Sequence, residues 1–187
     1  MTPWPVEFYA RDPLIVAPAL LGSLLVHRHP NRGELVGRIV EVEAYRGEED
    51  LACHASKGRT ARAATLFGPP GRAYVYLIYG MYDMFNAVTW PDGLPSAVLI
   101  RAVEPVRGID RTTDGPGKVT RALGIDRTLN EIDLTGSRLF IAPGAPVPAE
   151  RVATTPRIGV DYAGEWADRP WRFLERGNRH VSRAPRS

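Results

Sequence analysis

The stretch GRIVEVEA, residues 37–44, alternates polar and apolar side chains with the period of two that predicts a β-strand. One face of this predicted strand is mixed in character and carries Ile39, Glu41 and Glu43. The other face is wholly apolar and carries Val40, Val42 and Ala44. A strand with two carboxylates on one face is not the pattern of an ordinary core strand.

Two interpretations of the acidic face are open. It could be the polar side of an edge strand that faces water. It could instead present a carboxylate for general-base catalysis, because Tyr45 continues the same face and His54 follows nine residues later. The spacing alone leaves Glu41 and Glu43 as equal candidates for that base.

The segments around this strand predict a mixed α/β (α+β) fold. Further strands are expected at residues 73–79, 84–89, 97–103, 137–141 and 157–160, and helices in the apolar run 14–26 behind Asp12-Pro13 and at residues 118–123. Pro18 either starts or kinks the first helix, and Gly124 ends the second. The proline-rich stretch 141–156 is expected to be a surface loop. We therefore expect residues 1–187 to form a single domain, with a curved, largely antiparallel sheet, peripheral helices and a protruding β-hairpin.

The hairpin is predicted from the sequence YVYLIYGMY, residues 74–82. Core packing explains Tyr74 well, but it explains Tyr79, Met81 and Tyr82 poorly, because large residues are unusual at a hairpin tip. An exposed apolar tip usually grips something. Insertion between stacked bases is one such use.

Composition narrows the class of protein. The chain has 187 residues, 44% of them hydrophobic, so it can bury a core. Its longest apolar run is too short and too interrupted for a membrane span, and its single cysteine, Cys53, favours a reducing cytosol. The net charge is +3, and all basic residues except Lys57 and Lys118 are arginines. This bias toward arginine reflects either genomic composition or phosphate binding. The arginines that could bind phosphate are Arg72, Arg101, Arg107 and Arg121, with a cluster in the tail, Arg169, Arg172, Arg176, Arg179 and Arg183. The tail cluster would form one positive face if the tail were helical.

No motif predicts a metal or a cofactor. The pair Gly117-Lys118 lacks the first glycine and the Ser/Thr of a phosphate-binding loop. His27 and His29 lie in a loop-like context without a cysteine nearby, which argues against zinc. We therefore expect neither a metal nor a cofactor.

In combination, these segments resemble the alkyladenine (3-methyladenine) DNA glycosylase family. The matching stretches, which together run from about Phe8 to Ser182, are residues 41–60 (EVEAYRGEEDLACHASKGRT), 67–86 (FGPPGRAYVYLIYGMYDMFN), 97–105 (AVLIRAVEP), 115–125 (GPGKVTRALGI) and 157–173 (RIGVDYAGEWADRPWRF). The chain departs from the family at Ala55 and Ala63, where the family commonly has serine and asparagine.

The resemblance implies roles that spacing does not. It makes Glu43, which heads the Glu-Ala-Tyr motif, the catalytic base and Arg101 its catalytic neighbour. It also implies a base-binding pocket formed by the aromatic residues Tyr45, His54 and Tyr76, by Asn86, and by the backbone of Ala52 and Ile158. Tyr79 corresponds to the tyrosine that fills the gap in the duplex, and Met81 shares its hairpin tip. Asn86 would exclude unmodified guanine by crowding its 2-amino group.

The expected activity is that of a monofunctional DNA glycosylase in base excision repair. It would flip alkylated or deaminated purines from duplex DNA and hydrolyse the N-glycosidic bond with a Glu-activated water, leaving an abasic site. We expect a cytoplasmic monomer, nucleoid-associated if bacterial, with no membrane partner. Two alternatives are a nucleic-acid-binding module without chemistry, for which Glu43→Gln would be silent, and a hydrolase of free nucleosides, for which Tyr79 would be dispensable.

Overall fold

β2, Gly33–Arg46, is the longest strand and pairs with three others in the computed structural model, which describes residues 1–182. β5, Ser96–Arg107, runs along one edge of β2. The other edge is shared by β1, Leu24–His29, and β8, Arg172–Glu175. Both edges of β2 are therefore covered, so β2 lies inside the sheet.

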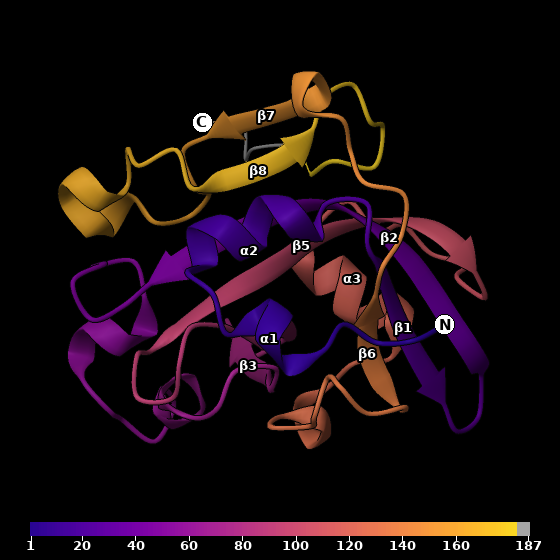
Figure 1. The fold of residues 1–187 in the computed structure, drawn as a ribbon, viewed down its shortest axis with the longest axis horizontal. Coiled ribbons are helices and arrows are strands. Elements are labelled where there is room, and N and C mark those ends of the chain that lie inside the picture. Colours follow the sequence, from indigo (N-terminus) through magenta and orange to yellow (C-terminus); the bar gives the residue numbers. More distant parts are fainter. Residues whose placement is uncertain (183–187) are drawn as a thin grey trace.

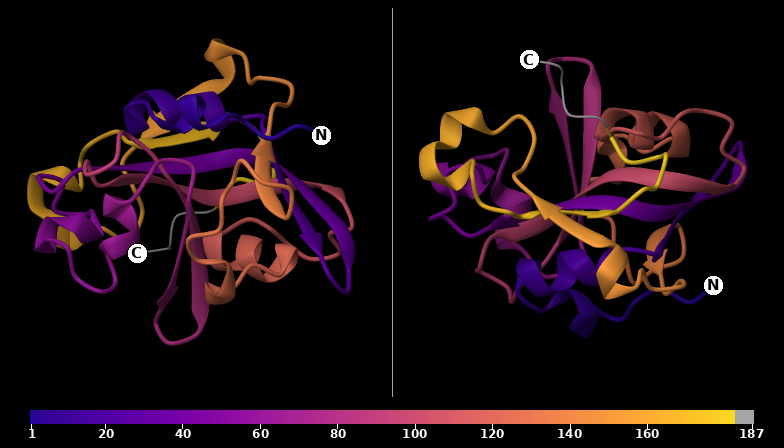
Figure 2. Two further views of the ribbon diagram at one scale, coloured as in Figure 1. Left: turned by 60° about the horizontal axis from the view of Figure 1, so that its bottom comes forward. Right: turned by 90° about the horizontal axis from the view of Figure 1, so that it is seen from above.

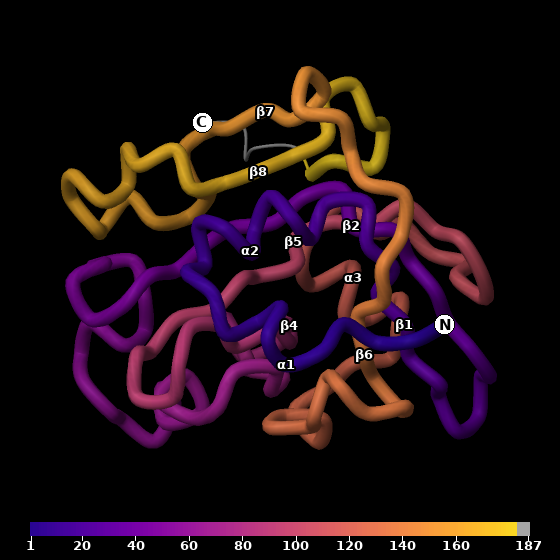
Figure 3. The backbone as a smooth tube through the Cα atoms, in the orientation of Figure 1, coloured from indigo at the N-terminus to yellow at the C-terminus, as the bar shows by residue number. Residues whose placement is uncertain are grey.

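The sheet continues on both sides of this centre in the order β3-β4-β5-β2-β1-β6, and every strand pair is antiparallel. The outer strands are β3 (Ala73–Ile78), β4 (Tyr82–Val88), β6 (Leu139–Ala142) and β7 (Val152–Thr155), and β7 pairs with β8. Figure 1 shows β7 and β8 as a ribbon along one side of the molecule, and the tube in Figure 3 follows the long connection from β6 to β7. The mixed α/β fold with a curved antiparallel sheet is confirmed.

The helices are short and lie around the sheet. They are α1 (Val6–Tyr9), α2 (Pro13–Leu20) and α3 (Pro116–Leu123), with 3-10 helices η1 (His54–Lys57), η2 (Ala64–Phe67), η3 (Arg127–Leu129), η4 (Ala149–Arg151) and η5 (Asp161–Trp166). Asp12 caps α2 by accepting a hydrogen bond from the Leu14 amide at 2.9 Å, as expected. Gly124 ends α3 in the left-handed conformation, also as expected. In the described residues, no helix is long and apolar enough to cross a membrane.

The main core lies between α2 and the central strands. Val16 and Leu20 of α2 are fully buried with Val42 of β2 and Ile100 of β5. On the other side, α3 packs against β4 and β5. The β3–β4 hairpin projects beyond this packed body, as both views of Figure 2 show. The protruding hairpin is thus confirmed as well.

Several predicted elements are wrong. The apolar run 14–26 is not one helix: α2 continues through Pro18 to Leu20, and β1 begins at Leu24. His27 and His29 accordingly lie in a strand rather than in a loop. Because both segments are buried, apolar character alone could not separate helix from strand.

The C-terminal third also differs from expectation. Residues 157–160 are irregular, whereas Val152–Thr155, placed in a surface loop, is the strand β7. The arginine-rich tail is not a helix, since Arg172 begins the strand β8 and its side chain is buried. Arg183 lies outside the described residues. Pairing between β7 and β8, which no local pattern encodes, decides this region.

Candidate active site

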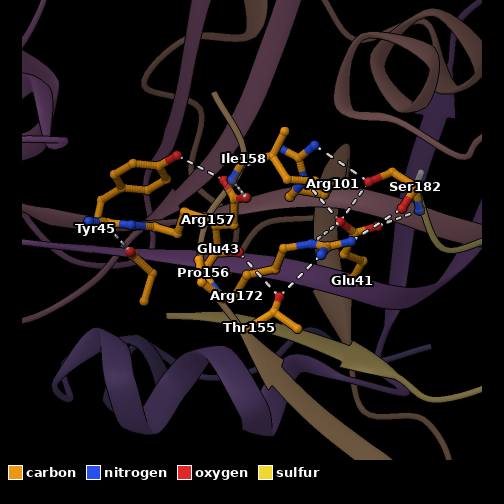
Figure 4. A network of polar contacts seen from close by, with 11 residues as sticks. Glu41, Glu43, Tyr45, Arg101, Thr155, Pro156, Arg157, Ile158, Arg172 and Ser182 are labelled. Carbon is orange, nitrogen blue, oxygen red and sulfur yellow. Dashed lines mark hydrogen bonds and ion pairs between the residues drawn. The ribbon is translucent and has the colours of Figure 1, made fainter. Parts of the chain in front are cut away.

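Glu43 lies near the C-terminal end of β2 and is completely buried. Its Oε2 accepts a hydrogen bond from the Tyr45 hydroxyl at 2.8 Å and lies 3.3 Å from Nη1 of Arg101. Its Oε1 accepts a hydrogen bond from the backbone N–H of Ile158 at 2.8 Å. Figure 4 shows Glu43 between Tyr45 on one side and Arg101 on the other. The edge-strand interpretation is therefore wrong: this carboxylate is held by protein groups, not by water.

A local irregularity in the pairing of β2 with β5 brings these groups together. The register shifts between Ile39 and Glu41 and again between Glu41 and Val42. Such bulges re-aim side chains next to active sites. As a result Ile39 packs in the main core with Val42, instead of sharing the face of the glutamates, and Arg101 of β5 reaches both Glu41 and Glu43.

Next to this carboxylate lies a cavity of about 330 Å³. Its lining includes most residues predicted to bind or cleave the substrate: Tyr45, Ala52, His54, Tyr76, Tyr79, Asn86, Arg101 and Ile158. Glu43 itself does not line the cavity but bonds to Tyr45, Arg101 and Ile158, which do. Concave sites of this size suit small ligands or single bases.

Aromatic rings dominate the cavity. His54 and Tyr76 meet edge to face with 4.6 Å between ring centroids, and Tyr74 lies 5.1 Å from Tyr76. The Tyr74 hydroxyl and His54 Nδ1 share a hydrogen bond of 2.8 Å. Arg62 covers the Tyr76 ring at 4.9 Å. These contacts join the three rings into one wall, since each ring contacts another member and Arg62 holds Tyr76 from outside the cavity.

The protonation states of the wall follow from its surroundings. Burial, with the nearby charges of Arg62 and Lys57, lowers the pKa of His54 to about 4, so its ring is neutral at pH 7. Burial and the Glu43 carboxylate hold the pKa of Tyr45 well above its ordinary value. Tyr45 therefore stays protonated, and its hydroxyl donates a hydrogen bond to Glu43.

Asn86 of β4 is buried, and its side-chain amide donates to the Tyr74 carbonyl at 3.1 Å. This bond orients the amide at the cavity lining. The Ile158 N–H, expected to face the base, instead donates to Glu43 in this structure.

The hairpin tip consists of Tyr79, Gly80 and Met81, between β3 and β4. Tyr79 is 82% exposed and Met81 is 64% exposed. Tyr79 and Gly80 have φ angles of +53° and +67°. A positive φ is strained for a bulky residue such as tyrosine and is found most often at functional sites. Tyr79 also lines the cavity, whereas Met81 does not.

Some site residues were missed by sequence reasoning. Arg157 forms a fully buried ion pair with Asp50, with bonds of 2.6 and 2.8 Å, and lies 4.8 Å over the Tyr45 ring. Tyr162, 72% exposed, lines the cavity mouth, and Tyr74 belongs to the aromatic wall rather than only to the core. A buried salt bridge 107 residues apart in sequence leaves no local signal. Among the described residues, no cluster of three His, Cys, Asp or Glu side chains could hold a metal.

An aromatic cavity beside a buried carboxylate fits an enzyme that handles single bases. Residues 7–179 match the methylpurine-DNA glycosylase family, and the chain belongs to that family. It is thus a DNA glycosylase, which hydrolyses N-glycosidic bonds in base excision repair.

Similar proteins agree with this assignment. A protein of Myxococcus xanthus (strain DK1622) is 54% identical over 97% of this chain and 94% of its own length. One from Anaeromyxobacter dehalogenans (strain 2CP-C) is 57% identical over 96% of this chain and 86% of its own length. One from Legionella pneumophila (strain Corby) is 51% identical over 96% of this chain and 97% of its own length. All three are provisionally named 3-methyladenine DNA glycosylases.

Proposed function

We propose that this chain removes alkylated or deaminated purines from duplex DNA, with Glu43 as the general base and Arg101 beside it. The observation that carries the proposal is the geometry of Glu43. A carboxylate offers about four lone-pair sites. Tyr45, Ile158 and Arg101 account for three of them, which leaves one for a water molecule.

That water would attack C1′ of the flipped nucleotide while the bond from C1′ to the purine nitrogen breaks. The bonding electrons leave with the purine, the new hydroxyl stays on C1′, and the water proton passes to Glu43. The positive charge of Arg101 compensates the negative charge of the Glu43 carboxylate before the reaction. The product is an abasic site.

The cavity suits a flipped, positively charged base. Purines methylated at N3 or N7 carry a positive charge, which aromatic faces attract by about 0.5–2 kcal/mol. Tyr45 and Tyr76 supply such faces, and His54, neutral at pH 7, does not repel the cation.

The Ala52 N–H donates to Asp50 at 3.1 Å and its carbonyl accepts from the Tyr162 hydroxyl at 3.4 Å, so the second lone pair of that carbonyl is what Ala52 would offer a base. The Ile158 N–H could bind a base only by releasing Glu43.

Asn86 would select against unmodified guanine by crowding its 2-amino group. This role is supported by its burial and by the bond that fixes its amide. Its test is the release of undamaged guanine by Asn86→Ala. Release at the wild-type level would remove this role.

Tyr79, with Met81 beside it, would fill the gap that the flipped nucleotide leaves. Flipping costs a few kcal/mol of unstacking, and an inserted apolar side chain offsets that cost. Arg121 lies over the Tyr82 ring at 5.6 Å, next to the hairpin tip, and Arg62 lies beside Tyr76. Both guanidinium groups are exposed and can contact DNA phosphates.

We further propose a monofunctional enzyme. A Schiff base with C1′ needs a lysine or amine in the cavity. Lys57 and Lys118 are the chain's two lysines, and neither lines the cavity. The enzyme would act as a monomer in the cytoplasm, on nucleoid DNA if bacterial.

The proposal is tested by excision from duplex oligonucleotides that carry 3-methyladenine, 7-methylguanine, hypoxanthine or ethenoadenine. Wild type should release at least one lesion base and leave an abasic site without strand cleavage. Glu43→Gln should bind the same duplex but lose about 10²- to 10⁴-fold in rate, the contribution typical of a general base. Undiminished excision by Glu43→Gln would contradict the proposal.

A further inference from the structure

The second glutamate of the strand, Glu41, is also fully buried and is bound even more completely than Glu43. Its Oε1 accepts hydrogen bonds from Arg101 Nε at 2.9 Å, from Arg172 Nε at 2.7 Å and from Ser182 Oγ at 2.7 Å. Its Oε2 accepts one from the Ser182 N–H at 2.6 Å. All four bonds come from protein groups, and Arg101 is the one bonded partner that lines the cavity.

Arg101 is the partner that connects Glu41 to the chemistry. Its Nε bonds to Glu41, its Nη1 lies 3.3 Å from Glu43 Oε2, and its Nη2 donates to Ser182 Oγ at 3.4 Å. Each nitrogen of this guanidinium therefore has a different acceptor. Because the guanidinium is a planar, rigid fork, these contacts fix its orientation relative to Glu43.

Ser182 closes the network from the far end of the chain. Its side chain and N–H bind Glu41, and its carbonyl accepts a hydrogen bond from Arg172 Nη2 at 3.2 Å. Figure 4 shows Ser182 and Glu41 on the side of Arg101 away from Tyr45. A residue 141 positions after Glu41 is thus held next to the catalytic strand.

We propose that Glu41 and Ser182 are positioning residues that set how Arg101 meets Glu43. The inference rests on the proposed function of Glu43 as base. By engaging Nε and Nη2, they leave only Nη1 for Glu43. Without them Arg101 turns into the bidentate pair that guanidinium and carboxylate favour. That pair occupies the lone-pair site that Glu43 needs for water.

The buried network contains equal numbers of acidic and basic side chains. Glu41 and Glu43 carry two negative charges, and Arg101 and Arg172 carry two positive ones, all buried. Removing one member of a buried pair leaves its partner's charge uncompensated. A test must therefore separate a loss of stability from a loss of positioning.

The chain offers a matched control in Glu175 of β8. Glu175 is also buried and pairs with Arg38 at 2.6 Å and Arg151 at 2.9 Å, but it does not contact Arg101. Glu41→Gln and Glu175→Gln each remove one buried carboxylate charge from the same sheet. The measurements are thermal stability, affinity for lesion-containing duplex, and the single-turnover excision rate with enzyme in excess.

We expect both variants to lose stability and both to keep their affinity for lesion DNA. Glu41→Gln should lose about 10- to 100-fold in the single-turnover rate, as small displacements of catalytic groups do, whereas Glu175→Gln should excise at the wild-type rate. Equal rates for the two variants would overturn the proposal.

Ser182 provides a second, milder test that does not depend on a change of charge. Ser182→Ala removes the hydroxyl that contacts both Glu41 and Arg101, and Ser182→Thr keeps it. The alanine variant should lose about tenfold in rate, the effect of a lost hydrogen bond to a charged group, and the threonine variant should recover it. A wild-type rate in Ser182→Ala would refute the role of Ser182.

Glu43→Gln is measured in parallel to separate the two proposals. If Glu43→Gln still excises, the proposed function fails and this inference fails with it. If Glu43→Gln is inactive while Glu41→Gln and Ser182→Ala excise normally, only the positioning role of Glu41 and Ser182 is wrong.

Discussion

The acidic part of β2 and the tip of the β3–β4 hairpin differ in almost every physical respect. Glu41 and Glu43 are completely buried, and both their carboxylates accept several hydrogen bonds or ion pairs. Tyr79 and Met81 are mostly exposed, and Tyr79 has a positive φ. One region is held by many partners, whereas the other extends away from the body (Figure 2).

The difference between the two regions matches two functions, catalysis by a buried base and insertion of a side chain into DNA. A general base must be oriented before its substrate arrives, so its surroundings are rigid and buried. A residue that enters a duplex finds its partners only in DNA, so it must be exposed beforehand. Mutations in the first region should therefore change stability and chemistry together, and mutations in the second should change function alone.

The largest expected effect is on the buried side. Asp50→Asn leaves Arg157 buried without its counter-charge and frees the segment whose Ile158 N–H binds Glu43. Losing one partner of a buried ion pair costs about 3–5 kcal/mol, and we expect this loss in urea unfolding. The exposed Asp161→Asn should change stability by less than about 0.5 kcal/mol. If Asp50→Asn also lost less than about 0.5 kcal/mol, the buried ion pair would not be what holds this region in place.

The next effect is on the exposed side. Tyr79→Ala removes the side chain proposed to fill the duplex, so excision from duplex DNA should fall by about tenfold or more, since a few kcal/mol of unstacking is no longer offset. Its free energy of unfolding should stay within about 0.5 kcal/mol of wild type, as for other surface substitutions. Leu94→Ala, another exposed apolar residue, in the loop between β4 and β5, is the control and should change neither quantity. Full activity in Tyr79→Ala would contradict the proposal that Tyr79 fills the gap in the duplex.

The smallest effect concerns pH. The pKa of His54 is lowered to about 4 in the folded protein from its ordinary 6.5. As pH falls from about 6.5 to about 4, the unfolded chain binds a proton that the folded chain does not, so stability is lost in that window. His54→Phe keeps an aromatic ring and should lose less stability between pH 7.5 and pH 5. His27, whose pKa is also lowered, is common to both proteins and cancels. Parallel losses would show that His54 titrates normally.

Much of this arrangement was predictable from the sequence. The period-two pattern located β2, and segments rich in aromatic and β-branched residues located β3 and β4. The apolar segment 97–103 located β5. The unusual hairpin tip was visible because large residues stand where turn residues are expected. Resemblance to the glycosylase family separated Glu43 from Glu41, which spacing could not do.

What was not predictable depends on long-range contacts. The bulges between β2 and β5 move Ile39 away from the glutamates, and the alternation of residues 37–44 gives no sign of them. The pairing of β7 with β8 and the buried Asp50–Arg157 and Glu41–Ser182 contacts join segments far apart in sequence. The tail arginines, which would share one face if helical, include Arg172, which is buried against Glu41 in a strand.

The measurement that tests the division of labour most directly follows flipping and cleavage in one reaction. A fluorescent base placed next to the lesion reports unstacking, and product analysis reports the abasic site. We predict that Glu43→Gln gives the full fluorescence rise without product, whereas Tyr79→Ala gives a reduced rise and correspondingly less product. Product formation by Glu43→Gln at the wild-type rate, or an undiminished fluorescence rise in Tyr79→Ala, would contradict the account.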